Sequence, residues 1–310
     1  MPFCESPNNI VRWQARKQLA TMIFGNDTGS IALFVYATST FWYQSYDDRI
    51  IATIVHFEVS MTIQAITIDF WNTLYDSSGG EGREMERGRV VLEQAHRLGV
   101  GLTHDMLKAA QQQAWKHFNR VWREEQRTPQ TRTMVEFFWQ ALGVRADAQA
   151  VEAVTTVFCE GVLAHPPKLL PKVKEVLSEL TSTHRIGHIA LISDTAFSPG
   201  RVLKQLMERD GVAEYFSAFS FSDETGVSKP HPHAYTIALA GVDVPLERCV
   251  HIGDIERTDI VGAKALGMKA ILFAGDPNGQ MNAEHQDKPT QADCRADSWE
   301  EVLEALRQMG

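Results

Sequence analysis

The stretch CVHIGDIERTD, residues 249–259, indicates the fold more strongly than any other part of the sequence. Its first five residues are mostly apolar, and they include the β-branched side chains that are typical of a buried strand. The aspartates Asp254 and Asp259 follow, and we expect a helix over residues 259–266. A strand, a polar turn and a helix in this order form the repeating unit of an α/β protein.

The same alternation of strands and helices extends from this stretch in both directions. Short apolar runs predict further strands at residues 65–69, 188–193, 218–221 and 269–273. Helices are expected between them at residues 172–180, at residues 199–210 and after Pro230. The predicted fold class is therefore α/β, with a Rossmann-like parallel sheet and right-handed crossovers.

A block of predicted helices interrupts this alternation directly after the first strand. The helices are expected at residues 83–98, 103–123, 131–142 and 147–163. Within the second of them, Trp115, Phe118, Val121 and Trp122 fall on one apolar face, which predicts that the block has a core of its own. We therefore expect residues 61–76 and 166–310 to form the α/β core, and residues 77–165 to form a helical cap.

Residues 1–60 differ in character from the rest of the chain. Residues 11–24 predict a short amphipathic helix, and residues 31–43 and 50–57 are rich in the β-branched and aromatic residues of strands. Met61 stands directly before the first clean strand. One hypothesis is that residues 1–60 are an upstream extension from a misassigned start codon, and the alternative is an accessory segment that packs on the core.

The composition excludes several classes of protein. Of the 310 residues 44% are hydrophobic and 22% are charged, which is typical of globular proteins and not of disordered ones. The net charge of −9 argues against a general nucleic-acid binder. No apolar stretch reaches the ~18 residues of a membrane span, and the first twenty residues do not resemble a signal peptide. We expect a cytoplasmic protein without nucleic-acid or membrane partners.

Polar side chains follow the predicted strands at the places where ligands bind to open parallel sheets. They are Asp69, Ser193, Lys229, Asp254 and Asp259. A carboxylate can act as a nucleophile on phosphorus, and a hydroxyl with an ammonium group can hold phosphoryl oxygens. Carboxylates together with backbone carbonyls are suited to bind Mg²⁺. The pattern therefore predicts phosphoryl chemistry at this edge of the sheet.

This ordered set of motifs resembles the haloacid dehalogenase (HAD) superfamily of hydrolases over about residues 61–275. The helical block resembles the C1-type cap of that family. The resemblance implies that Asp69 is the nucleophile and that Ser193 contacts the phosphoryl group. It also implies that Lys229 neutralises charge on the phosphoryl group and on Asp69. It thus implies a phosphatase that forms an aspartyl-phosphate with a small, anionic phosphorylated substrate.

The resemblance also implies a Mg²⁺ site. Asp69, the backbone carbonyl of Trp71 and Asp254 would ligate the ion, and Asp259 would support the site or act through a water molecule. Arg83 is the last residue of a glycine-rich hinge over residues 77–83, and its guanidinium group would suit a second anionic group on the substrate. The alternative for Arg83 is a solvated first turn of a helix.

One residue departs from the pattern of the HAD phosphatases. They usually have a second aspartate two residues after the nucleophile, as general acid and base, and this position is Trp71 here. An indole cannot exchange a proton near neutral pH, so hydrolysis of alkyl phosphates is expected to be slow. The alternatives are a 2-haloacid dehalogenase, whose family members often have an aromatic residue there, and a catalytically weak binding protein. The Asp254 and Asp259 pair argues against the dehalogenase.

Among the histidines, none shows a ligand pattern that is stronger than a structural explanation. His231 and His233 flank Pro232, and we expect them to open a helix rather than to bind a metal. His251 is expected to be a surface or core histidine. Asp194, directly after Ser193, is expected to be a loop residue.

Overall fold

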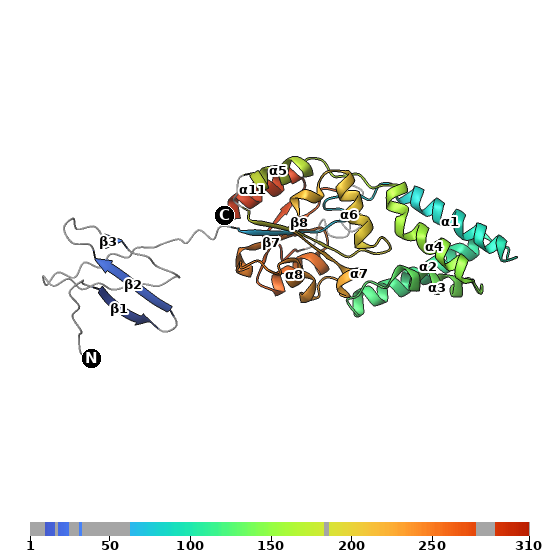
Figure 1. Ribbon diagram of the computed structural model, residues 1–310, viewed down its shortest axis with the longest axis horizontal. Coiled ribbons are helices and arrows are strands. Elements are labelled where there is room, and N and C mark those ends of the chain that lie inside the picture. The colour runs from blue at the N-terminus through green and yellow to red at the C-terminus, as the bar shows by residue number, and fades with distance from the viewer. Residues whose placement is uncertain are drawn as a thin grey trace. The chain divides into compact units, whose positions relative to one another are not determined.

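The computed structural model of the chain describes residues 10–15, 18–24, 31–32, 63–182, 186–276 and 289–309 (Figure 1). The chain divides into two compact units, Met1–Ser60 and Met61–Gly310. Each unit is described by itself below. No helix among the described residues is both long and apolar enough to cross a membrane.

The first unit contains a small antiparallel sheet in the order β1-β2-β3. Its strands are β1 (Ile10–Ala15), β2 (Gln18–Phe24) and β3 (Ile31–Ala32). The helix predicted over residues 11–24 is therefore wrong, because β1 and β2 pair from Ile10 opposite Ile23 to Ala15 opposite Gln18. Their β-branched and aromatic residues favour this extended pairing. The strand expected at residues 50–57 lies outside the described residues.

The second unit is built on a six-stranded parallel sheet in the order β6-β5-β4-β7-β8-β9. The strands are β4 (Ala65–Ile68), β5 (His188–Ser193), β6 (Ala218–Phe221), β7 (Cys249–Gly253), β8 (Lys269–Phe273) and β9 (Cys294–Ala296). The predicted α/β fold class with a parallel sheet is confirmed. Strand β9 was not predicted, because three residues are too few to show a periodic pattern.

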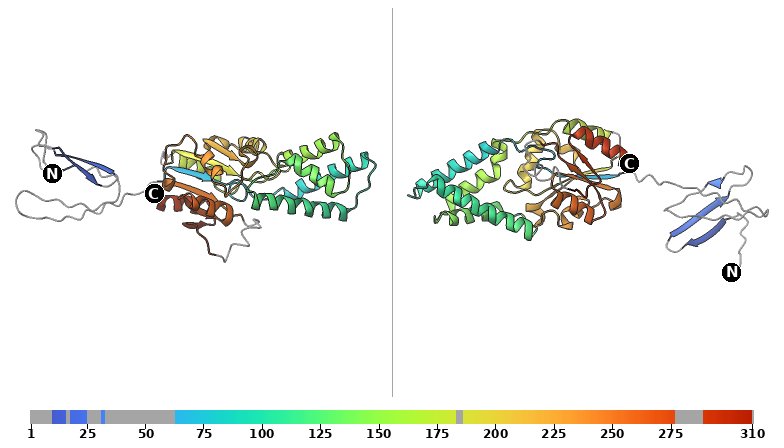
Figure 2. Two further views of the ribbon diagram at one scale, coloured as in Figure 1. Left: turned by 90° about the horizontal axis from the view of Figure 1, so that it is seen from below. Right: turned by 180° about the vertical axis from the view of Figure 1, so that it is seen from behind.

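Helices cover both faces of this sheet (Figure 2). Alternate residues point to opposite faces, so Ile66 and Ile68 pack in one apolar cluster while Ala65 packs in another. The first cluster contains residues of α5 (Val173–Ser182), α6 (Gly200–Arg209) and α11 (Trp299–Met309). The second contains residues of α8 (Pro232–Ala238) and α9 (Val261–Ala265). A strand that is apolar on both faces reads as a continuous apolar run, which is why the sequence identified these strands.

Short helical segments complete the connections of this unit. They are α7 (Ser222–Thr225), two 3₁₀ turns (Ala213–Tyr215 and Leu246–Arg248) and a π-helical turn (Glu256–Ile260) directly before α9. His231 caps the start of α8, where its ring accepts a hydrogen bond from the backbone N of His233 at 3.2 Å. The prediction that these histidines open a helix is confirmed.

Four helices between β4 and α5 lie together beside the sheet (Figure 1). They are α1 (Gly80–Arg97), α2 (His104–Glu124), α3 (Thr131–Ala141) and α4 (Ala148–Ala164), and each begins and ends within three residues of its predicted bounds. We call residues 80–164 the helical insert. Thr103 and Asp147 cap α2 and α4 with side-chain oxygens, which explains where these helices begin.

The helical insert has an apolar core that is separate from the two clusters on the sheet. Phe118 and Val121 of α2 are buried, as the sequence predicted, whereas Trp115 is 41% exposed. Some residues cross this separation: Phe197 and Ala196 of the loop after β5 pack into the core of the insert, and Val162 of α4 packs into a cluster on the sheet. The loop after β5 therefore links the insert to the carboxyl edge of the sheet.

Candidate active site

The order of the strands brings the predicted site residues to one edge of the sheet. Strand β4 lies between β5 and β7, with Ile68 opposite Leu191 on one side and Ile252 on the other. Asp69 directly follows β4, Ser193 ends β5, and Asp254 directly follows β7. These three residues, together with Lys229 and Asp259, are all at most 5% exposed.

Lys229 joins two of the carboxylates. Its Nζ donates hydrogen bonds to Oδ1 of Asp69 and, at 2.6 Å, to Oδ1 of Asp259. A third bond, of 3.2 Å, reaches the backbone carbonyl of Ile192. Burial alone would lower the pKa of the ammonium group, but Asp259 and Asp69 raise it well above its ordinary value. Lys229 therefore remains charged at any physiological pH.

Asp259 is fully occupied by partners from the chain itself. Its Oδ1 accepts from Lys229 and, at 3.0 Å, from Nε2 of His251, and its Oδ2 accepts from the backbone N of Ile255 at 2.9 Å and the hydroxyl of Thr258 at 3.2 Å. Burial alone would raise the pKa of this carboxyl group, but Lys229 and His251 hold it below its ordinary value. Of the two roles that the sequence left open for Asp259, this arrangement favours support of the site.

His251 is part of the site, although the sequence analysis did not place it there. It is fully buried in β7, and burial lowers the pKa of its imidazole. Its Nδ1 lies 2.8 Å from the hydroxyl of Thr67, while Nε2 faces Asp259. A neutral ring whose Nε2 donates to Asp259 and whose Nδ1 accepts from Thr67 satisfies all three groups. One feature of the sequence could have identified His251: it is a polar residue inside an otherwise apolar strand, three positions before Asp254.

Asp69 and Asp254 are both buried, but only Asp69 is bonded to a cation, Lys229, among the described residues. Burial raises the pKa of Asp69 to about 7, against the opposing effect of Lys229. Burial and the nearby charge of Asp69 raise the pKa of Asp254 well above its ordinary value. The amide of Asn72 donates to Asp254 at 3.2 Å. Neutral partners of this kind do not offset the repulsion between two carboxylates, whereas a bound cation does.

An oxygen-ligated cation fits this pair. Carboxylate and carbonyl oxygens are the donors that Mg²⁺ takes in proteins, usually with one or two carboxylates. In the part of the chain that the structure describes, no three His, Cys, Asp or Glu side chains are grouped so that they could hold a metal ion. A metal at Asp69 and Asp254 would therefore need further oxygens from the backbone, the substrate or water.

Several polar atoms are buried without a hydrogen-bond partner among the described residues. They include the hydroxyl oxygen of Ser193 and, in the loop after β4, the indole nitrogen of Trp71 and the hydroxyl oxygen of Thr73. An unsatisfied buried polar atom costs about 1–3 kcal/mol, and in a native protein it needs an explanation. The hydroxyl of Ser193 ends the strand next to Asp69, so a ligand with acceptor oxygens would satisfy it there.

Residues 63–267 match the sequence profile of the haloacid dehalogenase-like hydrolases. The chain belongs to this family of hydrolases. It is 28% identical over 230 residues to the ribulose-1,5-bisphosphate 5-phosphatase of Halopiger xanaduensis, which covers 71% of the chain and 87% of that relative. It is 34% identical over 74 residues to the glyceraldehyde 3-phosphate phosphatase of Pyrococcus furiosus, which covers 24% of the chain and 31% of that relative.

Solved structures show the same fold. A 2-haloacid dehalogenase from Pseudomonas syringae matches 80% of the chain and 100% of its own length, with a TM-score of 0.59 and 21% identity. The HAD-hydrolase YfnB from Bacillus subtilis, bound to magnesium, matches 78% of the chain and 98% of its own length, with a TM-score of 0.53 and 18% identity. At such identities the likeness extends to the fold of this HAD-like hydrolase and not to its substrate.

The loop that carries Trp71 turns sharply after Asp69. Asn72 has a φ of 56°, which lies in the left-handed region that asparagine tolerates better than most residues. The ring of Trp71 packs edge-on against Phe70, with the ring centroids 4.9 Å apart. In this HAD-like hydrolase the indole thus stands two residues after the predicted nucleophile, where its N–H can donate a hydrogen bond but cannot act as an acid or base near neutral pH.

Arg83 lies at the junction of the helical insert and the sheet. Its Nη1 donates to the backbone carbonyls of Ser78 at 3.0 Å and His165 at 2.7 Å, which belong to the two chain segments that enter and leave the insert. The side chain is buried, and its guanidinium carbon is 6.0 Å from the centroid of the Trp71 ring. Arg83 is therefore not the solvated side chain of a first helical turn, which was the alternative that the sequence left open. Contact between Arg83 and a substrate stays a prediction.

A connection between the helical insert and Lys229 was missed by the sequence analysis. Asp194 accepts hydrogen bonds from the backbone N of Lys229 at 3.0 Å and from the indole nitrogen of Trp122 at 2.7 Å. The guanidinium of Arg257 lies over the same indole, 4.4 Å from its centroid. Trp122 was predicted only as a core residue of the cap and Asp194 only as a loop residue. Nothing in the sequence indicates that the two meet.

Proposed function

We propose that this HAD-like hydrolase is a Mg²⁺-dependent phosphatase that acts on a small phosphorylated molecule through an aspartyl-phosphate on Asp69. The observation that carries the proposal is the buried cluster in which Lys229 joins Asp69 to Asp259 beside Asp254. The phosphatases among the relatives support a phosphate ester as the substrate. Asp69, Asp254 and the backbone carbonyl of Trp71 would hold the metal ion, which would supply positive charge to the phosphoryl oxygens.

In the proposed reaction each residue of the site has its own role. A carboxylate oxygen of Asp69 attacks phosphorus, and the alkoxide or phenoxide of the substrate leaves. Lys229 neutralises charge on Asp69 and on the phosphoryl group, and the unpartnered hydroxyl of Ser193 donates to a phosphoryl oxygen. A water molecule then attacks phosphorus in the aspartyl-phosphate, which releases inorganic phosphate and restores Asp69.

The experiment that tests the proposal measures two products side by side. Purified protein is assayed with p-nitrophenyl phosphate and Mg²⁺ for phosphate release, and with 2-chloropropionate for chloride release. We expect phosphate release that EDTA abolishes and Mg²⁺ restores, and no chloride release. Chloride release that is indifferent to EDTA would mean that the protein is a dehalogenase, the function that Trp71 favours. Binding of Mg²⁺ and phosphate without turnover of either substrate would mean a binding protein.

The raised pKa values of Asp69 and Asp254 should lower the stability of the metal-free protein as the pH rises from about 5 to 8, whereas the lowered pKa of His251 acts in the opposite direction below the ordinary pKa of imidazole. The pKa of Asp69 is about 7 in the folded chain and about 4 in an unfolded one. Between these values the folded state binds more protons than the unfolded state, so the free energy of unfolding falls with rising pH. The raised pKa of Asp254 acts in the same direction.

Melting temperatures in EDTA and in Mg²⁺ across this pH range test the prediction. Mg²⁺ should remove most of the decline, because a bound cation favours the charged carboxylates. In Asp254→Ala the melting temperature in EDTA should fall less with rising pH than in the wild type, and Mg²⁺ should raise it little. A wild-type melting temperature that responds to neither pH nor Mg²⁺ would contradict a metal site at these carboxylates.

Replacement of Trp71 by aspartate should restore a proton donor where HAD phosphatases have one. An alkyl leaving group needs a proton and an aryl leaving group needs it much less, so the wild type should prefer aryl phosphates. In Trp71→Asp the ratio of kcat/KM for an alkyl phosphate to that for an aryl phosphate should rise by about tenfold. Trp71→Phe, which supplies no carboxyl group, is the control and should leave the ratio unchanged. An unchanged ratio in a folded Trp71→Asp protein would place the proton donor elsewhere.

A further inference from the structure

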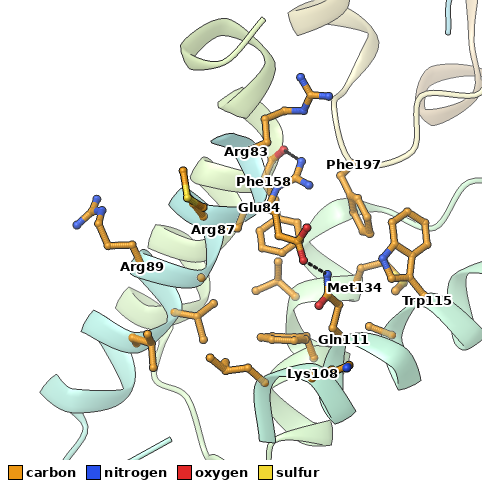
Figure 3. A pocket seen from close by; sticks show the side chains of 18 of the residues that line it. Arg83, Glu84, Arg87, Arg89, Lys108, Gln111, Trp115, Met134, Phe158 and Phe197 are labelled. Atoms are coloured by element: carbon orange, nitrogen blue, oxygen red, sulfur yellow. Dashed lines mark hydrogen bonds between the residues drawn. The ribbon is translucent and has the colours of Figure 1, made fainter. Parts of the chain in front are cut away.

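The helical insert contains a pocket of about 960 Å³ that is separate from the catalytic residues. Aromatic and aliphatic side chains from all four helices and from the loop after β5 line it, among them Trp115, Met134, Phe158 and Phe197 (Figure 3). Asp69, Ser193, Lys229, Asp254 and Asp259 are not among the lining residues. A largely apolar pocket of this volume is typical of sites for small organic molecules.

The pocket explains most of the large apolar side chains that the described part of the chain exposes. These are Met85, Leu92, Met106 and Trp115, with exposures of 65%, 43%, 39% and 41%. All except Met106 line the pocket. Apolar side chains that gather around a hollow mark a binding site more often than single exposed ones do. A ligand with an apolar body would cover them.

Arg87 gives the pocket a positive charge, and among the described residues it forms no ion pair with a carboxylate. Its guanidinium carbon lies 4.6 Å from the ring centroid of Phe158 and 5.5 Å from that of Phe197. Its Nη2 makes one bond of 3.3 Å, to the backbone carbonyl of Phe158, and its Nε is buried without a partner among the described residues. Burial, followed by the charge of Arg83, lowers the pKa of Arg87 to about 10, which still leaves it charged at neutral pH.

The other charged groups around the pocket are mostly held by the protein. Arg89 forms ion pairs with Glu86 and Glu93, and the carboxylate of Glu84 accepts from the amide of Gln111 at 3.0 Å. Arg83 and Lys108 are further lining cations that, among the described residues, form no ion pair with a carboxylate. Against Arg83, Arg87 and Lys108 stand two lining carboxylates, Glu81 and Glu84, so an excess of positive charge remains, and Arg87 stands beside apolar rings (Figure 3).

We propose that this pocket is a second ligand site, which takes a small amphipathic organic anion. The apolar body of the ligand lies against Trp115, Phe158 and Phe197, and its carboxylate, sulfonate or phosphate group pairs with Arg87. A planar guanidinium that is held between rings is well suited to such a group, because it presents donors in a fixed geometry. This site is independent of the proposed phosphatase function, since it is tested by binding alone.

The probe that tests the site is 8-anilinonaphthalene-1-sulfonate, with N-phenyl-1-naphthylamine as the neutral molecule of the same shape. Titration of the folded full-length protein should show one saturable site per chain for the sulfonate, detected by its fluorescence and by calorimetry. Octanoate should displace this probe at a concentration about tenfold or more below that of octanamide, because only octanoate carries the anion. Equal displacement by the two, or no saturable site, would overturn the proposal.

Three variants locate the ligand. Arg87→Gln should weaken binding of the sulfonate by about tenfold and of the neutral probe by less than about twofold. Arg89→Gln is the matched control, because Arg89 also lines the pocket but already has carboxylate partners, and it should change neither affinity. Ala114→Leu fills the pocket from α2 and should weaken both probes. The assignment would be contradicted if Arg87→Gln weakened binding of both probes equally. It would also be contradicted if Arg87→Gln and Arg89→Gln weakened binding of the sulfonate equally.

Discussion

The variant Asp69→Asn is expected to lose phosphatase activity by on the order of 10³-fold or more, because removal of a nucleophile leaves only the contributions of binding and orientation. The asparagine side chain has nearly the same shape as that of aspartate but cannot attack phosphorus. The measurement is kcat with p-nitrophenyl phosphate and Mg²⁺. Labelling by beryllofluoride, which forms on an aspartate nucleophile in the presence of Mg²⁺, should also be lost.

The fold of Asp69→Asn should remain intact. Lys229 retains Asp259 as a partner, and the variant removes one of the two charges that raise the pKa of Asp254. We therefore expect a melting temperature in EDTA that is no lower than that of the wild type. Asp297→Asn, at an exposed carboxylate that pairs with Arg295, is the control and should keep full activity. Substantial Mg²⁺-dependent activity in a purified Asp69→Asn protein would mean that Asp69 is not the nucleophile.

The variant Lys229→Met is expected to destabilise the protein by about 3–5 kcal/mol at neutral pH, in addition to abolishing activity. Methionine fills much of the volume of lysine, but it leaves Asp69 and Asp259 buried without their cation. A buried charge without a partner costs far more than an exposed pair contributes. Urea unfolding in EDTA measures the loss. The control is Lys264→Met, at a partly exposed pair with Asp293, which should cost no more than about 1 kcal/mol.

The destabilisation of Lys229→Met should shrink as the pH falls from 7 towards 4. In the wild type the folded pKa of Asp259 lies below its unfolded value, so the carboxylate contributes stability above that unfolded value. Without Lys229 burial raises the pKa of Asp259 instead, and its charge becomes a cost that protonation removes. A loss of stability that is independent of pH would mean that Lys229 acts through packing and not through its charge.

The α/β core and most of the candidate site could be predicted because both depend on local features of the sequence. Each core strand except β9 is a short apolar run, and each of Asp69, Ser193 and Asp254 stands at the end of such a run. Parallel strands end at one edge of a sheet, so the position after a strand already places a side chain there. The same reasoning failed for residues 11–24, where local apolar spacing fitted a helix while the chain forms β1 and β2.

The contacts between distant parts of the chain were decided only by the tertiary structure. Trp122 and Asp194 are 72 residues apart, and their hydrogen bond depends on how the helical insert sits against the loop after β5. His251 meets Asp259 because a strand and the turn that follows it fold back on each other. The pocket around Arg87 likewise exists only when four helices pack. The sequence by itself determined which side chains stand at strand ends, because that depends on a few consecutive residues. The tertiary structure decided which of these side chains lack a partner, because burial and pairing depend on residues that are distant in the sequence.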